Sequence, residues 1–270
     1  MPKISIILPV YNSNKERLSQ SIESVLLQSF KNFELIIIND ASTNDIEKTI
    51  IEYQHKDKRI LYIKNEHNLK LTKTLNKGLE VAQGEYIARI DDDDIWIDDY
   101  KLQKQFNFLH SHPEYGLCGT NIILEEMITK EQTKNYMQEN DQQIRNRMLL
   151  STQFSHSSIM IKKEAIDKYG SYNPDYNLME DHELRLRLGK YYKLHNIQDF
   201  TTLYRVNPQG VSLQNRRKQQ QLALKLCWKY RKEYPSFIKG LVGNIALNIL
   251  PEKVIGRINK LNRLSDKPFV

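Results

Sequence analysis

Tyr86-Ile-Ala-Arg-Ile90 is a strand-like run that leads directly into four consecutive aspartates, Asp91 to Asp94, which are followed by Ile95 and Trp96. Like charges crowded at a strand end repel one another and are costly without a compensating cation, and Mg²⁺ and Mn²⁺ favour carboxylate oxygens. An acidic run is also typical of a solvated loop. The apolar neighbours on both sides favour a cation-binding strand end.

Strand-like and helical patterns alternate along the first 125 residues. Ile4 to Val10 and Leu35 to Ile38 are near-continuous apolar runs, as expected of parallel strands covered on both faces. Between them a helix is expected, because Leu18, Ile22, Val25 and Leu26 recur at helical spacing. Helices over 45–53 and 71–81 and strands over 60–63 and 86–90 complete the alternation. The pattern predicts an α/β domain with a mainly parallel sheet. Ligands of such sheets bind beyond the carboxyl ends of the strands, so three loops, at Tyr11, Asp40 and Asp91, converge on one crevice.

The second half of the chain is less regular. Its pattern predicts a strand over 158–161, a short helix over 163–168 and a helix over 179–188 that begins with Glu180 and Asp181. Acidic residues in a first helical turn are favoured by the helix dipole alone. These two residues therefore fit a capping role as well as a catalytic one.

The charge of the chain is divided unevenly. Residues 213–270 hold 13 Lys plus Arg and 3 Asp plus Glu, a net charge of +10, so residues 1–212 carry −3. We therefore predict a catalytic domain over 1–212 and a basic tail over 213–270. No nucleic-acid-binding motif accompanies the positive charge, so nucleic acid is not an expected partner.

The tail has two apolar stripes at helical spacing. The first runs from Ile238 to Ile249 and the second, after Pro251, from Val254 to Leu261, and Lys and Arg surround both. Such basic amphipathic helices lie on anionic membranes. They also pack on their own domain or on a second subunit as a homodimer. The sequence leaves these alternatives open.

Targeting signals and cysteine motifs are not evident. The N-terminal residues have no signal-peptide pattern, and no stretch of ~18 apolar residues would span a bilayer. We expect a cytoplasmic protein, either free or peripheral on the inner face of the plasma membrane. Cys118 and Cys227 belong to no paired motif and are expected to be reduced packing residues.

Four segments follow one another in order: Ser5-Ile-Ile-Leu-Pro-Val-Tyr-Asn12, Asn39-Asp-Ala-Ser-Thr43, Gly84-Glu-Tyr-Ile-Ala-Arg-Ile-Asp-Asp-Asp-Asp94 and Glu180-Asp181. In this order and spacing they resemble the family 2 glycosyltransferases, inverting enzymes with the GT-A fold. The bacterial branch that builds capsule, O-antigen or lipooligosaccharide chains is the most similar. The resemblance covers roughly residues 3–212 and implies a GT-A nucleotide-sugar-binding domain followed by a basic helical tail.

The resemblance implies a site for a UDP-sugar donor. The aromatic ring of Tyr11 can stack on a base or be an ordinary strand-end aromatic, and Asp40 can accept the imide N–H of uracil. By analogy Asp93 reaches the Mn²⁺ or Mg²⁺ ion that bridges the diphosphate. The implied nucleotide-binding residues are Pro9, Val10, Tyr11, Asn12, Asp40, Lys73, Asp91 and Asp92.

Three of these assignments stay open at this point. Asp91 or Asp92 would contact the ribose, and Asp92 replaces the small residue that the family usually has inside its acidic motif. Either Lys73 or Arg89 would add a second positive contact to the diphosphate. A surface role fits both equally well.

The resemblance also implies the catalytic base and an acceptor site. Asp181 matches the family's base, which deprotonates the hydroxyl of a glycan or lipid-linked acceptor. Glu180 would orient the acceptor or perturb the pKa of Asp181. His156 resembles part of a His-Pro-Ser element without its proline and fits an acceptor-site or a structural role. The alternatives are a nucleotide-sugar-binding protein without transferase activity and a sugar nucleotidyltransferase; the donor sugar and the linkage are not determined by the sequence.

Overall fold

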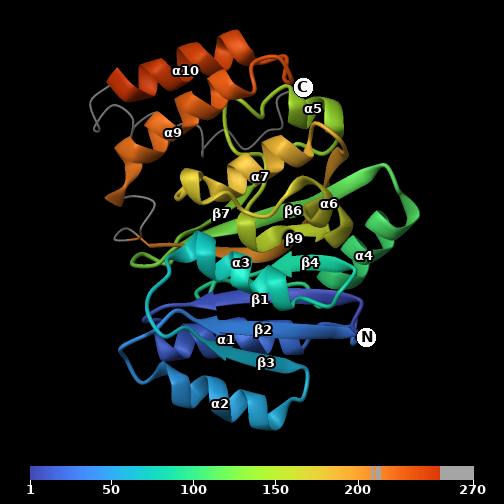
Figure 1. The fold of residues 1–270 in the computed structure, drawn as a ribbon, viewed down its shortest axis with the longest axis vertical. Coiled ribbons are helices and arrows are strands. Elements are labelled where there is room, and N and C mark those ends of the chain that lie inside the picture. The colour runs from blue at the N-terminus through green and yellow to red at the C-terminus, as the bar shows by residue number, and fades with distance from the viewer. Residues whose placement is uncertain (208–209, 211–213, 250–270) are drawn as a thin grey trace.

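A nine-stranded sheet runs through the molecule in the order β3-β2-β1-β4-β8-β6-β9-β5, with β7 paired to β6 (Figure 1). We describe it from a computed structural model, in which residues 1–207, 210 and 214–249 are placed. The strands are β1 (Ile4–Val10), β2 (Phe33–Asn39), β3 (Ile60–Lys64), β4 (Tyr86–Arg89), β5 (Ile95–Trp96), β6 (Tyr115–Glu126), β7 (Gln132–Asn135), β8 (Met160–Lys162) and β9 (Lys193–Val206).

Helices cover both faces of this sheet (Figure 1). They are α1 (Lys15–Leu26), α2 (Ile46–Lys56), α3 (Leu71–Val81), α4 (Lys101–Ser111), α5 (Asp141–Arg145), α6 (Lys163–Tyr169), α7 (Glu180–Leu188), α9 (Arg216–Lys229) and α10 (Phe237–Ile249). Two single turns of 3₁₀-helix, η1 (His156–Ser158) and η2 (Pro174–Tyr176), lie between them.

The N-terminal half has the predicted architecture. Strands β3, β2, β1 and β4 are parallel neighbours, so their carboxyl ends share one edge of the sheet. Successive residues of β1 bury on opposite faces: Ile6 lies in one apolar cluster with Leu18 of α1, and Ile7 lies in the other with Leu75 of α3. Burial on both faces explains why these strands read as unbroken apolar runs.

The second half continues the sheet with mixed pairing. Strand β8 is antiparallel to both β4 and β6, whereas the long strands β6 and β9 are parallel. The strand predicted from residue 158 begins at Met160, because His156, Ser157 and Ser158 form the turn η1. This turn contacts β4, β6 and β9, which places it in the middle of the sheet edge.

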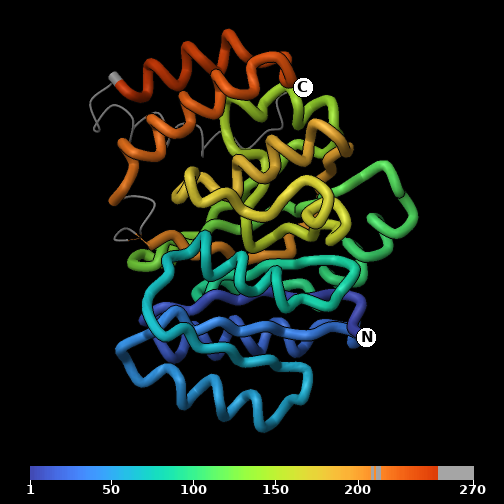
Figure 2. The backbone as a smooth tube through the Cα atoms, in the orientation of Figure 1, coloured from blue at the N-terminus to red at the C-terminus, as the bar shows by residue number. Residues whose placement is uncertain are grey.

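The tail is continuous with the core at its first helix. Leu226, Cys227, Tyr230 and Tyr234 belong to the same apolar cluster as Leu186 of α7, and α9 lies beside α7 (Figure 2). The division at residue 212 remains a prediction. The second apolar stripe, over 254–261, lies outside the described residues.

Two smaller features are the cysteines and the lengths of the helices. Both cysteines, Cys118 and Cys227, are free and buried, as expected of packing residues. Within the described ranges, none of the helices combines the length and the apolar character that crossing a membrane requires.

Gly84 precedes β4 and lies against the backbone of β1. A Cβ atom at Gly84 would lie 2.5 Å from the backbone nitrogen of Ser5 and 2.7 Å from the carbonyl carbon of Ile4. We expect Gly84→Ala to lower the free energy of unfolding by about 1–3 kcal/mol, because β1 would have to move.

The matched control is Gly243 in α10, where an added Cβ meets nothing within 4 Å. Gly243→Ala should leave the stability unchanged or raise it by about 0.5–1 kcal/mol, because alanine favours helix. Urea denaturation at constant m-value measures both changes. Equal stability of the two variants would contradict the assigned contact.

Candidate active site

The loops after β1 and β2 are joined at the carboxyl edge of the sheet. The Asn12 backbone N–H donates to the Ser42 hydroxyl at 2.9 Å, and the Thr43 N–H donates to the Asn12 side-chain oxygen at 2.8 Å. Asn12 has a φ of 50°, a conformation that asparagine tolerates better than most residues. Tyr11, next to it, is half-exposed, so its ring is available for stacking.

Asp40 connects the loop after β2 to the loop after β3. One carboxylate oxygen accepts from the Asn65 amide and from the Leu69 N–H, both at 2.8 Å, and the other accepts from the Lys70 N–H at 3.0 Å. Lys70 has a φ of 70°, so these bonds hold a strained turn at the start of α3. Asp40 therefore organises a loop, and one lone pair on its second oxygen is left for a ligand.

The acidic run is partly neutralised from inside the sheet. The buried guanidinium of Arg89 forms a two-pronged ion pair with Asp91. The Ser157 hydroxyl, from η1, lies between the carboxylates of Asp91 and Asp94. Asp94 is fully buried and also accepts from the Arg205 N–H of β9 at 2.9 Å. Asp91 and Asp94 are thus held by the protein itself.

The two middle aspartates differ from these. The Ser13 hydroxyl and the Tyr11 N–H donate to Asp92, whose pKa is raised to about 6 chiefly by burial. Burial and the charges of Asp91 and Asp92 raise the pKa of Asp93 to about 7, and nothing in the described parts of the chain forms a hydrogen bond or ion pair with its carboxylate. Because both pKa values lie above those of an unfolded chain, the stability that these groups contribute is lost as the pH rises from about 4 to about 7.

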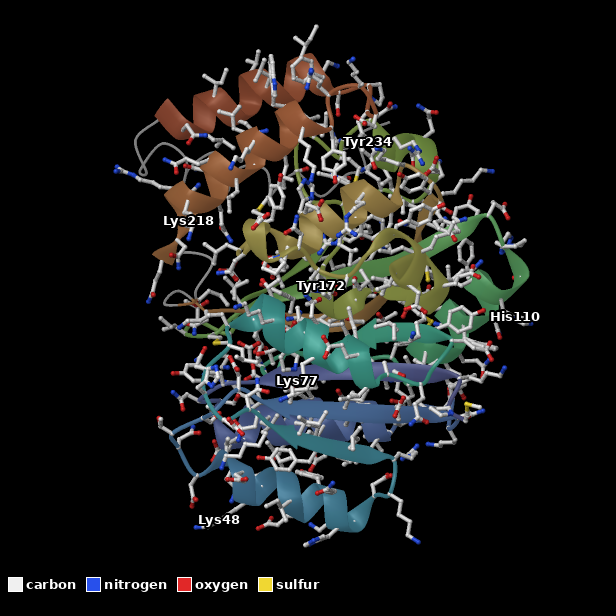
Figure 3. All side chains as sticks on the ribbon, in the orientation of Figure 1. Lys48, Lys77, His110, Tyr172, Lys218 and Tyr234 are labelled. Carbon is white, nitrogen blue, oxygen red and sulfur yellow. The ribbon has the colours of Figure 1, made fainter. Side chains whose placement is uncertain are left out.

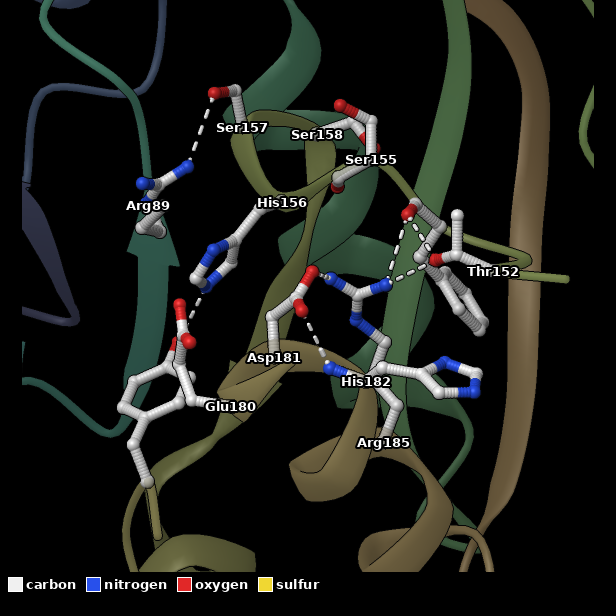
Figure 4. Close-up of polar contacts among 12 residues, drawn as sticks. Arg89, Thr152, Ser155, His156, Ser157, Ser158, Glu180, Asp181, His182 and Arg185 are labelled. Atoms are coloured by element: carbon white, nitrogen blue, oxygen red, sulfur yellow. Dashed lines mark hydrogen bonds and ion pairs between the residues drawn. The ribbon is translucent and has the colours of Figure 1, made fainter. Parts of the chain in front are cut away.

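Asp181 opens α7 and is held by two donors (Figure 4). Its carboxylate accepts from the His182 N–H at 2.7 Å and pairs with Arg185, one turn along the helix. Arg185 is only 1% exposed and also donates to the Thr152 hydroxyl at 2.6 Å and the Phe154 carbonyl at 2.9 Å. Burial opposes ionisation of Asp181, but the combined effects of Arg185, His156, His182 and the His182 N–H outweigh it and lower the pKa below the ordinary range.

Glu180 and His156 lie beside Asp181 (Figure 4). Burial, together with the charge of Asp181, raises the pKa of Glu180 to about 7. The His156 ring nitrogen Nε2 lies 2.8 Å from the Tyr172 hydroxyl. Burial and then the charge of Arg89 lower the pKa of His156, so the ring is neutral near pH 7. Arg89 thus pairs with the acidic run and also acts electrostatically on His156 and Glu180.

The remaining predicted residues are Pro9, Val10 and Lys73. Pro9 and Val10 are buried at the end of β1, and Lys73 is exposed on α3 without a hydrogen bond or ion pair to any residue that the structure places. Sequence reasoning missed Arg185, although its spacing of four residues from Asp181 on a helix is a recognisable signal. It also missed Tyr172, for which the sequence holds no local signal.

Comparison with known proteins identifies the class. The family model described as glycosyl transferase family 2 matches residues 5–170. An uncharacterised glycosyltransferase of Methanocaldococcus jannaschii is 32% identical over 248 residues, covering 86% of this chain and 82% of its own. The putative glycosyltransferase EpsE of Bacillus subtilis is 33% identical over 219 residues, covering 80% and 76%. The chain belongs to glycosyl transferase family 2 and is a glycosyltransferase.

Solved structures with the same fold agree with this assignment. TarS of S. aureus, in complex with UDP-GlcNAc, has a TM-score of 0.71 at 15% identity, over 96% of this chain and 76% of its own. The mannosyltransferase PcManGT of Pyrobaculum calidifontis, in complex with GDP-Man and Mn²⁺, has a TM-score of 0.67 at 14% identity, over 98% and 80%. At these identities the likeness concerns the fold, and the expected GT-A architecture is confirmed.

Proposed function

We propose that this glycosyltransferase moves a sugar, with inversion at the anomeric carbon, from a UDP-sugar to a hydroxyl of a growing surface glycan or lipid-linked acceptor, with a divalent cation at the diphosphate. The observation that carries the proposal is the turn η1, which lies between two carboxylate sites: its Ser157 hydroxyl binds Asp91 and Asp94, and its His156 lies beside Asp181 (Figure 4). The Asp93 carboxylate has no partner in the described parts of the chain and suits a cation with an anionic leaving group, and Asp181 suits proton removal.

The donor half of the proposal rests on the joined loops. The half-exposed ring of Tyr11 offers a stacking surface to uracil. Asn12 and Asp40 bind neighbouring loops and would fix the distance between the base and the phosphates. Asp92, held by Ser13, is the candidate for the ribose hydroxyls, because Asp91 already receives both prongs of Arg89.

A divalent ion fits the acidic run through Asp93. The described residues contain no group of three or more His, Cys, Asp or Glu side chains that would hold a metal by themselves. Mg²⁺ sites of the nucleotide type use one or two carboxylates and take their other ligands from phosphates and water. When bound, the ion would neutralise charge on the departing diphosphate, and Asp93 would be its protein ligand.

The acceptor half rests on Asp181. A base is useful only in its ionised form, and Arg185 keeps Asp181 ionised although it is buried. Two side chains beside Asp181 would contact the acceptor. They are the neutral ring of His156, which is hydrogen-bonded to Tyr172, and the carboxyl group of Glu180.

A glycan acceptor is supported by a named relative. The amylovoran biosynthesis glycosyltransferase AmsE of Erwinia amylovora is 30% identical over 185 residues, covering 68% of each chain. Its name refers to the biosynthesis of amylovoran. We infer a similar class of acceptor for this chain.

The metal assignment predicts cation-dependent binding of UDP. The purified protein should bind UDP only weakly in EDTA and more tightly with Mn²⁺ or Mg²⁺, because the diphosphate would otherwise face uncompensated aspartates. Asp93→Ala should abolish this difference in calorimetry. Asp99→Ala, at an exposed aspartate nearby, is the control and should keep it. Equal affinity with and without metal in the wild type would refute the role of Asp93.

The base assignment predicts that Asp181→Asn binds UDP normally and loses turnover. Loss of a general base costs ~10²- to 10⁴-fold, and the amide keeps the shape of the carboxylate. Release of UDP from a panel of UDP-sugars, with water as the acceptor, measures the rate and identifies the donor. NMR of the first sugar released should show β configuration from an α-linked donor. Near-normal turnover of the variant, or retention, would overturn the mechanism.

Arg185 is expected to act through Asp181. In Arg185→Met the largest effect that opposes burial is lost, so the pKa of Asp181 rises and Asp181 is protonated at higher pH. Turnover should therefore fall more steeply than in the wild type as the pH is lowered from 8 to 5. Below the raised pKa of Asp181, the fall should be on the order of tenfold for each pH unit. Arg185→Lys should restore part of the wild-type profile.

Arg187 supplies a matched control for this prediction. It lies on the same helix, pairs with Glu183 four residues earlier and donates to the carbonyls of Tyr169, Gly170 and Ser171. Arg187→Met should reduce the melting temperature and leave the shape of the pH profile unchanged. If both variants merely lower stability, Arg185 is only a packing residue.

A further inference from the structure

The helices α9 and α10 form a hairpin at the end of the molecule opposite α2 (Figure 1). A groove of about 650 Å³ lies between them. Its apolar lining includes Leu222 and Trp228 of α9 and Leu241 and Ile245 of α10, and Lys218 and Lys225 stand beside these side chains. The hairpin thus combines an apolar floor with two ammonium groups.

The outer surface of the hairpin is also apolar. Ile238 is 74% exposed, Val242 is 62% exposed and Trp228 is 56% exposed. Ile238, Val242 and Ile245 are spaced four and three residues apart, so they share one face of α10. Isolated exposed apolar side chains are normal on proteins, whereas a contiguous stripe next to an apolar groove indicates a binding surface.

The charge of the hairpin is strongly positive. Residues 214–249 hold eight Lys plus Arg and one acidic residue, Glu233, a net charge of +7. The Glu233 Oε1 atom lies 3.4 Å from the Nζ atom of Lys190, in the catalytic domain. Lys218 and Lys225 have no hydrogen bond or ion pair with the rest of the described chain. These two cations are therefore free to pair with an anion from outside.

We propose that this face of the α9–α10 hairpin docks on an anionic lipid bilayer, with Trp228, Ile238 and Val242 in the headgroup–acyl boundary and Lys218 and Lys225 against lipid phosphates. An aliphatic stripe flanked by lysines is complementary to this surface in both its apolar and its charged parts. A second copy of the hairpin would bring one segment of net charge +7 against another. Nucleic acid would leave the aliphatic side chains without apolar partners.

Docking would hold the catalytic domain at the membrane, where lipid-linked acceptors lie. This surface is separate from the proposed donor and acceptor sites. Its binding to lipid can be measured directly, without knowledge of the sugar and without turnover.

Vesicle sedimentation with the full chain tests the proposal. The protein should sediment with phosphatidylglycerol vesicles at about 0.1 M salt and remain in solution with phosphatidylcholine vesicles or at roughly 1 M salt, where the Debye length is ~3 Å. The chain has two tryptophans, and Trp96 is only 2% exposed. A blue shift of tryptophan emission on binding should therefore come from Trp228 and disappear in Trp228→Phe, which should still sediment.

Paired variants locate the binding face. Lys218→Gln with Lys225→Gln should weaken the partition coefficient by on the order of 30-fold, from about tenfold per 1.4 kcal/mol and ~1 kcal/mol per lysine. The matched control is Lys56→Gln with Lys58→Gln, near α2, which changes the net charge by the same amount. These two pairs lie at opposite ends of the molecule, which Lys48 and Lys218 mark in Figure 3. Ile238→Ser with Val242→Ser should abolish the binding that persists at intermediate salt.

Three results would overturn the proposal. The first is that the wild type does not sediment with phosphatidylglycerol vesicles. The second is that the two lysine double variants lose vesicle binding equally. The third is that light scattering shows a dimer, which Ile238→Ser with Val242→Ser dissociates. UDP release should be unchanged in all these variants, which shows that they are folded. Absence of UDP release in the wild type would count against the proposed function and leave the vesicle result interpretable.

Discussion

The structure depends on one electrostatic constraint, the four carboxylates of Asp91 to Asp94 at the end of a buried strand. Arg89, the penultimate residue before them, is buried in β4 and pairs with the first of the four. One guanidinium cannot compensate four carboxylates. The surrounding loops therefore supply further donors, from Ser13 after β1, Ser157 in η1 and the Arg205 backbone in β9. The need to satisfy these charges brings distant segments to one edge of the sheet.

This arrangement divides the aspartates into two functional groups. Asp91 and Asp94 are occupied by protein donors and hold the loops, whereas Asp93 keeps a raised pKa and no partner within the described chain. A carboxylate that destabilises the free protein is stabilised when a cation binds, so binding and folding are coupled at this position. The stability lost near neutral pH is consistent with a site built for a charged ligand rather than for the empty state.

The sequence predicted the parallel half of the fold because its signals are local. Ile4 to Val10 and Leu35 to Ile38 read as doubly buried strands. The first observed strand has these bounds, and the second, Phe33–Asn39, begins two residues earlier and ends one residue later. The alternation also placed the loops of Tyr11, Asp40 and Asp91 together. The mixed pairing of β8 with β4 and β6 could not be predicted, because it depends on contacts between segments more than forty residues apart. The partner of Asp92, Ser13, likewise lies in a distant loop.

The adjacent acids Glu180 and Asp181 show why composition alone does not assign roles. Both lie in the first turn of α7, yet Asp181 faces Arg185 and stays ionised, while Glu180 forms no ion pair with the described residues, accepts the Leu178 N–H and has a pKa of about 7. Ionising two neighbouring buried carboxylates is unfavourable, so the one with the cation takes the charge. In the proposed mechanism Asp181 removes the acceptor proton, and the ion pair with Arg185 favours the ionised form that this step requires.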